Sequence, residues 1–368
     1  MSEVGVNLGE RSYVVTIGRG VLSRLGEIVA SVRRPSVAAV ISNPTVARLY
    51  RDDARESLAS AGIRAELITV AAGERSKTLA TVRRVYDALV ELKMDRSGAI
   101  VALGGGVIGD LAGFAAATYM RGIDFYQVPT TLLAQVDASV GGKTGVDLPQ
   151  GKNLIGAFHQ PRAVVIDTST LDSLPARELR SGLAEVVKHG IIYDQEFFRY
   201  LEARAAELLA RNGDALAEAI RRSVEIKRDV VQADERESGL RAILNYGHTV
   251  GHAIEVTTGY GRYRHGEAVS IGMVVEAVIA EREGYARESI AEPVARVLAK
   301  MRLPVEMDRS VSTDALIRAI ELDKKARGGE IRLALPIRIG KCEVFIVSRE
   351  ALAGAFGVRN FSCALAGA

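Results

Sequence analysis

Three of the five histidines in the chain lie close together in the sequence, at His248, His252 and His265. Neutral imidazole is a common metal ligand, and residues four apart, such as His248 and His252, share one face of a helix. His265 follows a loop-like segment of glycine and tyrosine that could bring it back to the same point. The cluster therefore predicts a metal site. The alternative is that each histidine is a hydrogen-bonded core or capping residue.

The composition is that of a globular protein and limits the kind of function. The 368 residues, 48% hydrophobic and 25% charged, suffice for about two domains of roughly 150 residues each. A net charge of +3 argues against a general nucleic-acid surface, so any cationic function must be local. The cysteines Cys342 and Cys363 suggest no disulfide scaffold, and we find no signal peptide or membrane-spanning run. We therefore expect a cytoplasmic protein.

The pattern of expected elements changes near residue 172. Before it, apolar strands alternate with helices, which is typical of a parallel sheet covered on both faces. We expect strands over 37–41, 65–70, 99–103, 124–128 and 163–167, and helices over 45–59 and 79–93. After it, we expect helices over 178–192, 194–211, 214–233, 240–257, 267–283 and 293–301, with weak strands over 331–336 and 344–347. The prediction is an α/β Rossmann-like parallel-sheet domain over residues 1–172 and a mostly α-helical domain over residues 173–368.

A glycine-rich segment, residues 104–109, follows the expected strand over 99–103 and opens a helix. It has the GxGxxG spacing that lets a backbone approach a pyrophosphate at a helix N-terminus. The alternative is a tight strand-to-helix turn, which also needs glycine. The acidic partner for a ribose is not convincing, because Asp124 begins a strand; Asn43, which follows an earlier strand, is another candidate.

Several lysines and one arginine suit an anionic substrate. Lys143 and Lys152 are flanked by glycines, as anion contacts often are, although a solvated loop explains them equally well. Glu185 and Lys188 share a helix face, either as an ion pair or as a carboxylate ligand beside a cation. Further positive charge precedes the histidines in the sequence, at Lys227 and Arg241.

Eight segments spread along the chain carry a family resemblance. They are residues 104–110 (GGGVIGD), 116–122 (AATYMRG), 128–137 (VPTTLLAQVD), 141–145 (GGKTG), 151–153 (GKN), 184–188 (AEVVK), 234–237 (DERE) and 245–252 (NYGHTVGH). In this order they closely resemble the 3-dehydroquinate synthase family of the shikimate pathway, a branch of the sugar-phosphate cyclases. The matches extend from about residue 40 to residue 345.

The resemblance implies a cytoplasmic homodimer that uses NAD and one divalent metal, zinc or cobalt. It implies conversion of 3-deoxy-D-arabino-heptulosonate 7-phosphate to 3-dehydroquinate and phosphate. The implied metal ligands are Glu185, His248 and His265, with His252 in a supporting proton-relay role. The implied residues at the substrate are Asp137, Lys143, Lys152, Asn153, Lys188, Lys227, Arg241, Asn245, one of Lys324 and Lys325, and Arg121 from the neighbouring subunit.

For NAD, the resemblance implies contacts from one set of residues, most of which follow expected strands. They are Asn43, Glu74, Lys77, Gly104, Gly105, Gly106, Asp110, Thr130, Thr131, Lys143, Lys152, Thr170 and Ser173. Ala72 departs from the usual acidic residue or proline before Gly73 and Glu74. Three other functions compete: a related cyclase acting on another sugar phosphate or an amino analogue, a metal-dependent polyol dehydrogenase, and a non-catalytic NAD- or metal-binding regulator.

Overall fold

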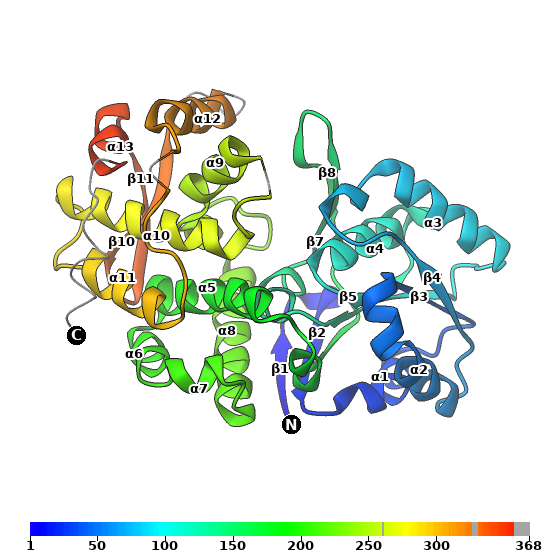
Figure 1. Cartoon of the computed structure of the whole chain (residues 1–368). Coiled ribbons are helices and arrows are strands. Elements are labelled where there is room, and N and C mark those ends of the chain that lie inside the picture. Colours follow the sequence, from blue (N-terminus) through cyan, green and yellow to red (C-terminus); the bar gives the residue numbers. More distant parts are fainter. Residues whose placement is uncertain (260, 309, 326–329, 357–368) are drawn as a thin grey trace. The chain divides into compact units, whose positions relative to one another are not determined.

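The computed structural model describes residues 1–259, 261–308, 310–325 and 330–356, without the side chains of residues 323–325. Its described residues form two compact units (Figure 1). The first contains residues 1–174 and 216–232, and the second contains residues 175–215 and 233–356. Helix α8 (Gly213–Ala233) contributes most of its length to the first unit. The division into domains of residues 1–172 and 173–368 stays a prediction.

The first unit is built on a seven-stranded sheet in the order β1-β2-β9-β6-β5-β3-β4. Its strands are β1 (Ser2–Val6), β2 (Tyr13–Gly18), β3 (Ala38–Ser42), β4 (Ala65–Thr69), β5 (Ala99–Gly104), β6 (Asp124–Pro129) and β9 (Ala163–Asp167). All neighbouring pairs are parallel except β1 with β2. Strands β3, β5, β6 and β9 are buried along their whole length, as expected for strands covered on both faces.

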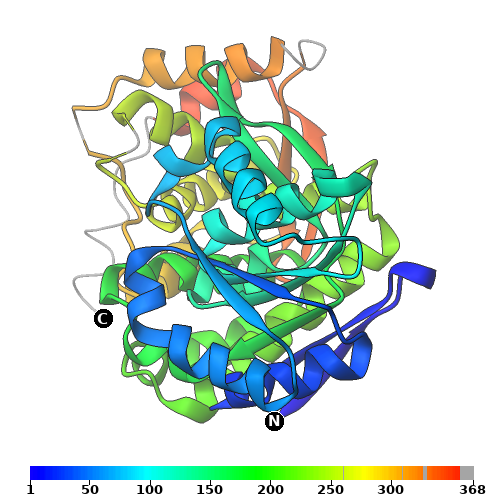
Figure 2. The ribbon, with the colours of Figure 1, turned by 90° about the vertical axis from the view of Figure 1, so that its right-hand side faces the viewer.

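Helices cover the two faces of this sheet. They are α1 (Leu25–Val32), α2 (Pro44–Ser60), α3 (Leu79–Glu91) and α4 (Gly106–Thr118). Successive side chains of a strand point to opposite faces: Ile100 packs in the core with α3 and α4, and Val101 packs in the core with α1 and α2. Figures 1 and 2 show this layering, with α1 and α2 on one side of the sheet and α3 and α4 on the other. The predicted α/β class of this part is confirmed.

A second, two-stranded sheet in the first unit lies where the sequence analysis placed only glycine-flanked lysines. It is the antiparallel hairpin of β7 (Lys143–Leu148) and β8 (Gly151–Phe158). The hairpin packs closely on α4: a Cβ added at Gly113 would lie 2.4 Å from Cγ2 of Thr144. The segment is therefore a paired hairpin and not a loop, although Lys143 and all of β8 are exposed or half-buried.

The second unit is mostly helical, as predicted. Its elements are α5 (Ala176–Tyr193), α6 (Gln195–Ala203), α7 (Ala205–Leu209), α9 (His248–Thr258), α10 (His265–Arg282), α11 (Ala291–Lys300), α12 (Thr313–Lys325), α13 (Arg349–Phe356) and the hairpin of β10 (Arg332–Arg338) with β11 (Lys341–Ile346). Helices α5 and α10 are buried along most of their length. Gly266 allows their close approach, because a Cβ there would lie 2.0 Å from the carbonyl oxygen of Ser181.

The helix expected over residues 240–257 is wrong as a single element. A 3₁₀ turn covers Leu240–Asn245, the chain then turns at Gly247 (φ 79°), and α9 begins at His248. A left-handed conformation of this kind suits glycine and interrupts a helix. His248 therefore stands at the start of a helix instead of in its middle. The helix expected over 194–211 is also broken, at Arg204 between α6 and α7. Among the described helices, none is long and apolar enough to cross a membrane.

Candidate active site

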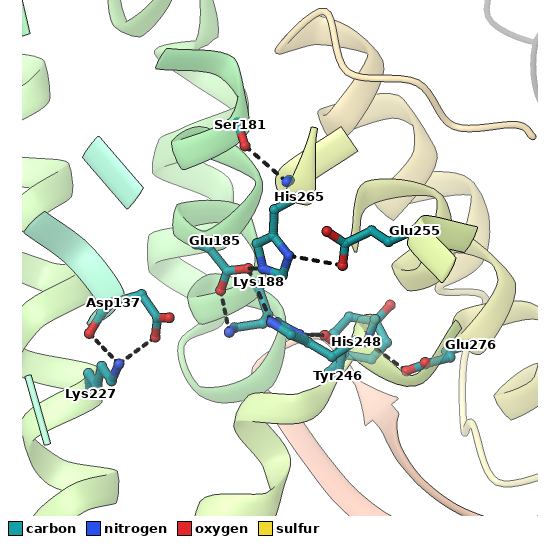
Figure 3. Close-up of polar contacts among 12 residues, drawn as sticks. Asp137, Ser181, Glu185, Lys188, Lys227, Tyr246, His248, Glu255, His265 and Glu276 are labelled. Atoms are coloured by element: carbon teal, nitrogen blue, oxygen red, sulfur yellow. Dashed lines mark hydrogen bonds and ion pairs between the residues drawn. The ribbon is translucent and has the colours of Figure 1, made fainter. Parts of the chain in front are cut away.

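One carboxylate and two imidazoles from three helices converge in the second unit (Figure 3). Glu185 projects from the middle of α5 and is completely buried. His248 and His265 are the first residues of α9 and α10. Their Nε2 atoms lie 3.5 and 3.7 Å from the same oxygen, Oε1 of Glu185. The packing of these helices thus brings Glu185, which is distant in the sequence, to the two histidines.

The geometry of this cluster fits a divalent metal ion. Two atoms bound tetrahedrally to one zinc at 2.0–2.1 Å lie roughly 3.3 Å apart, close to the separations in this cluster. Oε1 of Glu185 is buried and accepts no hydrogen bond within the described part of the chain, so a cation would satisfy it. Three protein ligands would leave one coordination position open, as a catalytic site requires.

Burial and neighbouring charges keep two of the three side chains in the states that bind a metal, whereas Glu185 and Glu255 outweigh burial and raise the pKa of His265 to about 10, so a metal would have to displace a proton from this imidazole. Burial alone would raise the pKa of Glu185, but Lys188, His248 and His265 hold it well below its usual range, so the carboxylate is ionised. The ammonium group of Lys188 pairs with Oε2. Burial lowers the pKa of His248 to about 3, which keeps this imidazole neutral with a lone pair free for a metal.

The start of α9 is held in place by a buried carboxylate of α10. Glu276 accepts hydrogen bonds from the backbone N–H groups of Gly247 (2.6 Å) and Val250 (3.3 Å). The carbonyl oxygen of Tyr246 lies 3.2 Å from Nδ1 of His248. The sequence analysis assigned no role to Glu276. A carboxylate within the apolar run of α10 could have indicated it, because a buried carboxylate needs a hydrogen-bond partner.

His252 lies beside the cluster at its more exposed side. Its ring centroid is 5.5 Å from that of His248 and 6.0 Å from that of His265. Together with Glu255 and His265 it forms a second group whose ligand atoms lie within 4.8 Å of one another. The four-residue spacing suggests that His248 and His252 would bind a metal together. In the structure, the group that contains His248 is instead completed by Glu185 and His265.

The carboxyl ends of the parallel strands carry most of the residues expected at NAD. Asn43 follows β3, Gly105 follows β5, Thr130 follows β6, and Thr170 follows β9. From β3 the chain continues to β4 on one side, and it then returns to form β5 on the other side of β3. A topological switch point therefore lies between β3 and β5. Ligands of open parallel sheets bind at such a crevice.

The local contacts at this edge fit a nucleotide. Helix α4 begins at Gly106 directly after β5, so its first N–H groups are offered to an anion. The buried hydroxyl of Thr130 has no hydrogen-bond partner among the described residues. Asn43, in contrast, uses its side-chain oxygen to cap α2, accepting from Thr45 and Val46. Thr170 accepts a hydrogen bond from Gln135, and Ser173 pairs with the hydroxyl of Tyr50.

Lys77 joins two sets of residues that the sequence analysis kept apart. It is 3% exposed, and its Nζ lies 2.5 Å from both Oδ2 of Asp110 and Oδ1 of Asn153. Asn153 was expected at the substrate and the other two at NAD. The backbone N–H of Asn153 also donates to Asp147. Nearby, burial raises the pKa of Glu74.

Asp124 has two arginine partners at the amino end of β6, away from the carboxyl ends of the strands where the expected NAD residues lie. It begins β6 and pairs with Arg162 (2.8 Å) and Arg33 (3.2 Å). Because the glycine segment follows the carboxyl end of β5, which runs parallel to β6, a role for Asp124 at the ribose is excluded by position.

Asp137 and Lys227 form a pair in the first unit. Asp137 lies in a π-helical turn (Ala134–Ala138), a feature found often at functional sites. The ammonium group of Lys227, on α8, donates to the carboxylate of Asp137 at 2.5 Å and also to its backbone carbonyl. Lys227 is 5% exposed, so its charge is oriented by this contact.

Arg241 and Asn245 lie in a turn of the second unit organised by Asp234. Asp234 accepts hydrogen bonds from the backbone N–H groups of Gly239 and Arg241. Arg241 is 2% exposed and donates to the carbonyl oxygen of Glu235. The side-chain amide of Asn245 donates to Glu237 at 2.9 Å.

The remaining expected residues are placed more simply. Lys143 and Lys152 lie near opposite ends of the β7–β8 hairpin. Thr131 lies beside Gly105, whose added Cβ would be 3.1 Å from Cγ2 of Thr131. Arg121 is exposed, and its backbone is left-handed (φ 68°). The side chains of Lys324 and Lys325 lie outside the described residues.

Solved structures with this fold define its class. A 2-epi-5-epi-valiolone synthase from Streptomyces hygroscopicus subsp. jinggangensis 5008, with NAD⁺ and Zn²⁺ bound, is 30% identical, covers 98% of both chains and has a TM-score of 0.86. A 2-deoxy-scyllo-inosose synthase complexed with carbaglucose-6-phosphate, NAD⁺ and Co²⁺ is 28% identical, with a TM-score of 0.87 over 96% of this chain and 99% of that one. The fold is that of the sugar-phosphate cyclases.

Sequence relatives narrow this class. The family models described as the 3-dehydroquinate synthase N-terminal and C-terminal regions match residues 67–181 and 182–326. The 3-dehydroquinate synthase of Pelotomaculum thermopropionicum (strain DSM 13744 / JCM 10971 / SI) is 51% identical over 344 residues, which are 94% of this chain and 93% of the relative. The chain belongs to the 3-dehydroquinate synthase family.

Proposed function

We propose that the chain is a 3-dehydroquinate synthase. It would convert 3-deoxy-D-arabino-heptulosonate 7-phosphate to 3-dehydroquinate and phosphate by transient oxidation, β-elimination of phosphate, reduction and intramolecular aldol closure. The observation that carries this proposal is the 51% identity to a 3-dehydroquinate synthase over 94% of the chain. The cluster of Glu185, His248 and His265 supports it, because it has the ligand types and spacing of a catalytic metal site.

The two cofactors would divide the chemistry. A divalent metal, zinc or cobalt, held by Glu185, His248 and His265, would acidify and polarise substrate oxygens. NAD would accept a hydride from the substrate and return it, so that it is not consumed. The cyclase structures with NAD⁺ and Zn²⁺ or Co²⁺ bound support both assignments.

We assign binding of the anionic substrate to buried or oriented cations. Lys188 and Arg241 are almost completely buried, and charges in such surroundings interact more strongly than in water. Lys227 is fixed by Asp137. Holding a multiply charged substrate in one pose would lower the entropic barrier to reaction. The other proposed substrate residues are Lys143, Lys152, Asn153, Asn245 and Lys324, with His252 as a proton carrier beside the metal ligands.

For NAD, the proposed contacts gather at the carboxyl edge of the sheet. The pyrophosphate would lie against the first N–H groups of α4, and the hydroxyl of Thr130 would donate to the nucleotide. The complete proposed set is Asn43, Glu74, Lys77, Gly104, Gly105, Gly106, Asp110, Thr130, Thr131, Lys143, Lys152, Thr170 and Ser173. Because Asn43 already caps α2, its free contribution would be the amide N–H groups.

We also propose a homodimer in which Arg121 acts in the neighbouring active site. Its exposed side chain and left-handed backbone support a functional constraint, because such strain is usually kept for a reason. Mixing an Arg121→Ala subunit with an inactive Glu185→Gln subunit should restore part of the activity if Arg121 acts across subunits. If it acts within its own subunit, mixed dimers will remain inactive. The cytoplasmic location stays a prediction.

One assay separates this function from its rivals. Purified protein is incubated with the heptulosonate phosphate, a catalytic amount of NAD, and zinc, and both phosphate and 3-dehydroquinate are measured. We expect stoichiometric release of both products without net NADH. Accumulation of NADH without phosphate would indicate a polyol dehydrogenase. Faster turnover of glucose 6-phosphate or sedoheptulose 7-phosphate would indicate another cyclase, and no turnover of any substrate would indicate a binding protein.

A further inference from the structure

The imidazole ring of His265 lies between two carboxylates. Its Nε2 lies 3.7 Å from Oε1 of Glu185, and its Nδ1 lies 3.5 Å from Oε2 of Glu255 on α9. The side chain of Glu255 is 7% exposed. Figure 3 shows this arrangement, with Glu185 and Glu255 on opposite sides of the ring. One nitrogen of His265 thus faces the proposed metal position and the other faces a buried acid.

Helix α9 places Glu255 at this point. Glu255 follows His248 by seven residues, so the two share one helix face, and α9 packs along α10. Helix α9 therefore carries both the proposed ligand His248 and Glu255, the carboxylate that faces the other histidine ligand, His265. A buried carboxylate is costly unless it has a partner, and His265 is one such partner, with its Nδ1 3.5 Å from Oε2 of Glu255.

The backbone of His265 is fixed by contacts that do not involve Glu255. The N–H of Gly266 donates to the hydroxyl of Ser181 at 2.9 Å, and the N–H of Arg264 donates to Glu267 at 2.9 Å. The freedom that remains is rotation of the His265 side chain and the choice of its tautomer. Glu255 is positioned to fix both, because an acceptor at Nδ1 places the proton there and leaves the Nε2 lone pair for a metal.

The two proposed histidine ligands differ in the kind of acceptor at Nδ1. For His248 it is the backbone carbonyl oxygen of Tyr246, at 3.2 Å. For His265 it is a side chain, Glu255. Mutation can therefore remove the acceptor of His265 without altering the backbone.

We propose that Glu255 is a positioning residue of the metal centre: it accepts a hydrogen bond from the Nδ1–H of His265, aims Nε2 at the metal and raises metal affinity. This inference rests on the metal centre of the proposed function. Removal of an acceptor of this kind typically costs about 10- to 100-fold in metal affinity.

The test measures zinc affinity without substrate. Glu255→Gln keeps the side-chain volume, and Glu283→Gln at the exposed end of α10 is the control with the same change in charge. The zinc dissociation constant is obtained by competition with a chromophoric chelator. We expect Glu255→Gln to bind zinc about 10- to 100-fold more weakly, and Glu283→Gln to match the parent protein. An unchanged dissociation constant for Glu255→Gln would overturn the proposal.

A spectrum and a second variant separate positioning from a loss of folding. Bound Co²⁺ should show an altered visible absorption spectrum in Glu255→Gln, because His265 is held less firmly. If Glu255→Gln does not fold, Glu255→Asp keeps the charge but withdraws the carboxylate, and we expect weaker zinc binding there too. Parent-like zinc affinity and Co²⁺ absorption in Glu255→Asp would contradict a role that depends on the reach of the side chain.

Metal stoichiometry distinguishes this role from a second metal site. His252, Glu255 and His265 could themselves hold an ion. We expect one zinc per chain in both the parent protein and Glu255→Gln; two ions falling to one would make Glu255 a ligand and overturn the proposal. The titration needs no substrate, so it can succeed even if the protein releases no phosphate from the heptulosonate, in which case only the proposed function fails.

Discussion

Lys188 lies one helical turn after Glu185 on α5, and its ammonium group contacts Oε2 of that carboxylate while Oε1 faces His248 and His265. Glu185 is 0% and Lys188 1% exposed. The two oxygens of one buried carboxylate are therefore divided between a permanent cation and the proposed metal position. Such a division keeps Glu185 ionised whether or not a metal is bound.

Lys188→Met should destabilise the protein more strongly without metal than with it. Removing one partner of a buried ion pair typically costs about 3–5 kcal/mol, and a bound divalent ion would compensate part of the loss at Glu185. Urea unfolding in the presence of a chelator, and again with zinc, measures the difference. Lys300→Met is the control, because Lys300 pairs with Glu202 at the surface and should cost less than about 1 kcal/mol. Equal losses for both variants would show that Lys188 does not compensate a buried charge.

His265→Ala should lose bound metal, whereas His252→Ala should retain it and turn over slowly. His265 faces the buried oxygen of Glu185, while His252 lies at the exposed side of the cluster. Metal content after desalting, measured by atomic emission, and steady-state phosphate release test the two variants. Equal loss of metal in both would make the proposed ligand set wrong.

Lys227→Met should lower kcat/KM for the heptulosonate phosphate by roughly 10- to 150-fold, the range expected for one charged hydrogen bond. The reason is that Asp137 holds the Lys227 ammonium group in place, and methionine cannot supply its charge. Arg228→Met, on the same helix and paired with Asp229, is the control and should remain near the parent value. Comparable losses in the two variants would indicate a general effect on α8.

Gly106→Val should weaken NAD binding by about tenfold or more, because a side chain would crowd the N–H groups offered at the start of α4. A Cβ there would already lie 3.3 Å from Cβ of Ala138. Calorimetric titration with NAD measures the change. Gly5→Val in β1 is the control, since a Cβ at Gly5 meets nothing within 4 Å. NAD affinity unchanged by Gly106→Val would argue against this binding position.

The carboxylate of Asp234 should make the free energy of unfolding depend on pH in the acidic range. Burial alone would raise its pKa, but hydrogen bonds from Ser238, Arg241 and Gly239 outweigh burial and lower the pKa to about 2, from 3.8 for an ordinary aspartate. The folded chain therefore binds fewer protons than the unfolded chain. The stabilisation is complete above about pH 4 and is lost as the pH falls toward 2.

The measurement for Asp234 is the difference in unfolding free energy between the parent protein and Asp234→Asn from pH 2 to pH 6. We expect this difference to shrink as the pH falls. Asp53→Asn, at an exposed position of α2, should show no comparable trend. A difference that stays constant over the whole range would mean that the carboxylate charge does not stabilise the turn.

Local patterns were enough to predict most of the fold. The apolar runs of β3, β5 and β9 and the amphipathic face of α3 can be recognised within a few residues, because burial on one or both faces restricts the residue types allowed there. The strands β1 and β2 at one side of the sheet and the helix α12 were not predicted. The break at Gly247 was missed because residues 240–257 keep a helical pattern, and only the left-handed backbone at that glycine reveals the turn.

The sequence by itself determined the chemistry available to this protein: a glycine segment after a strand, cations among glycines, a histidine cluster and a set of motifs that assign a family. The tertiary structure decided which of these groups meet. Glu185 reaches His248 and His265 only because α5, α9 and α10 pack together, and Lys77 reaches Asn153 only through the β7–β8 hairpin. Spacing along a chain predicts neighbours on one helix, such as His248 and His252. Contacts between distant segments depend on how buried surfaces fit, which no local pattern specifies.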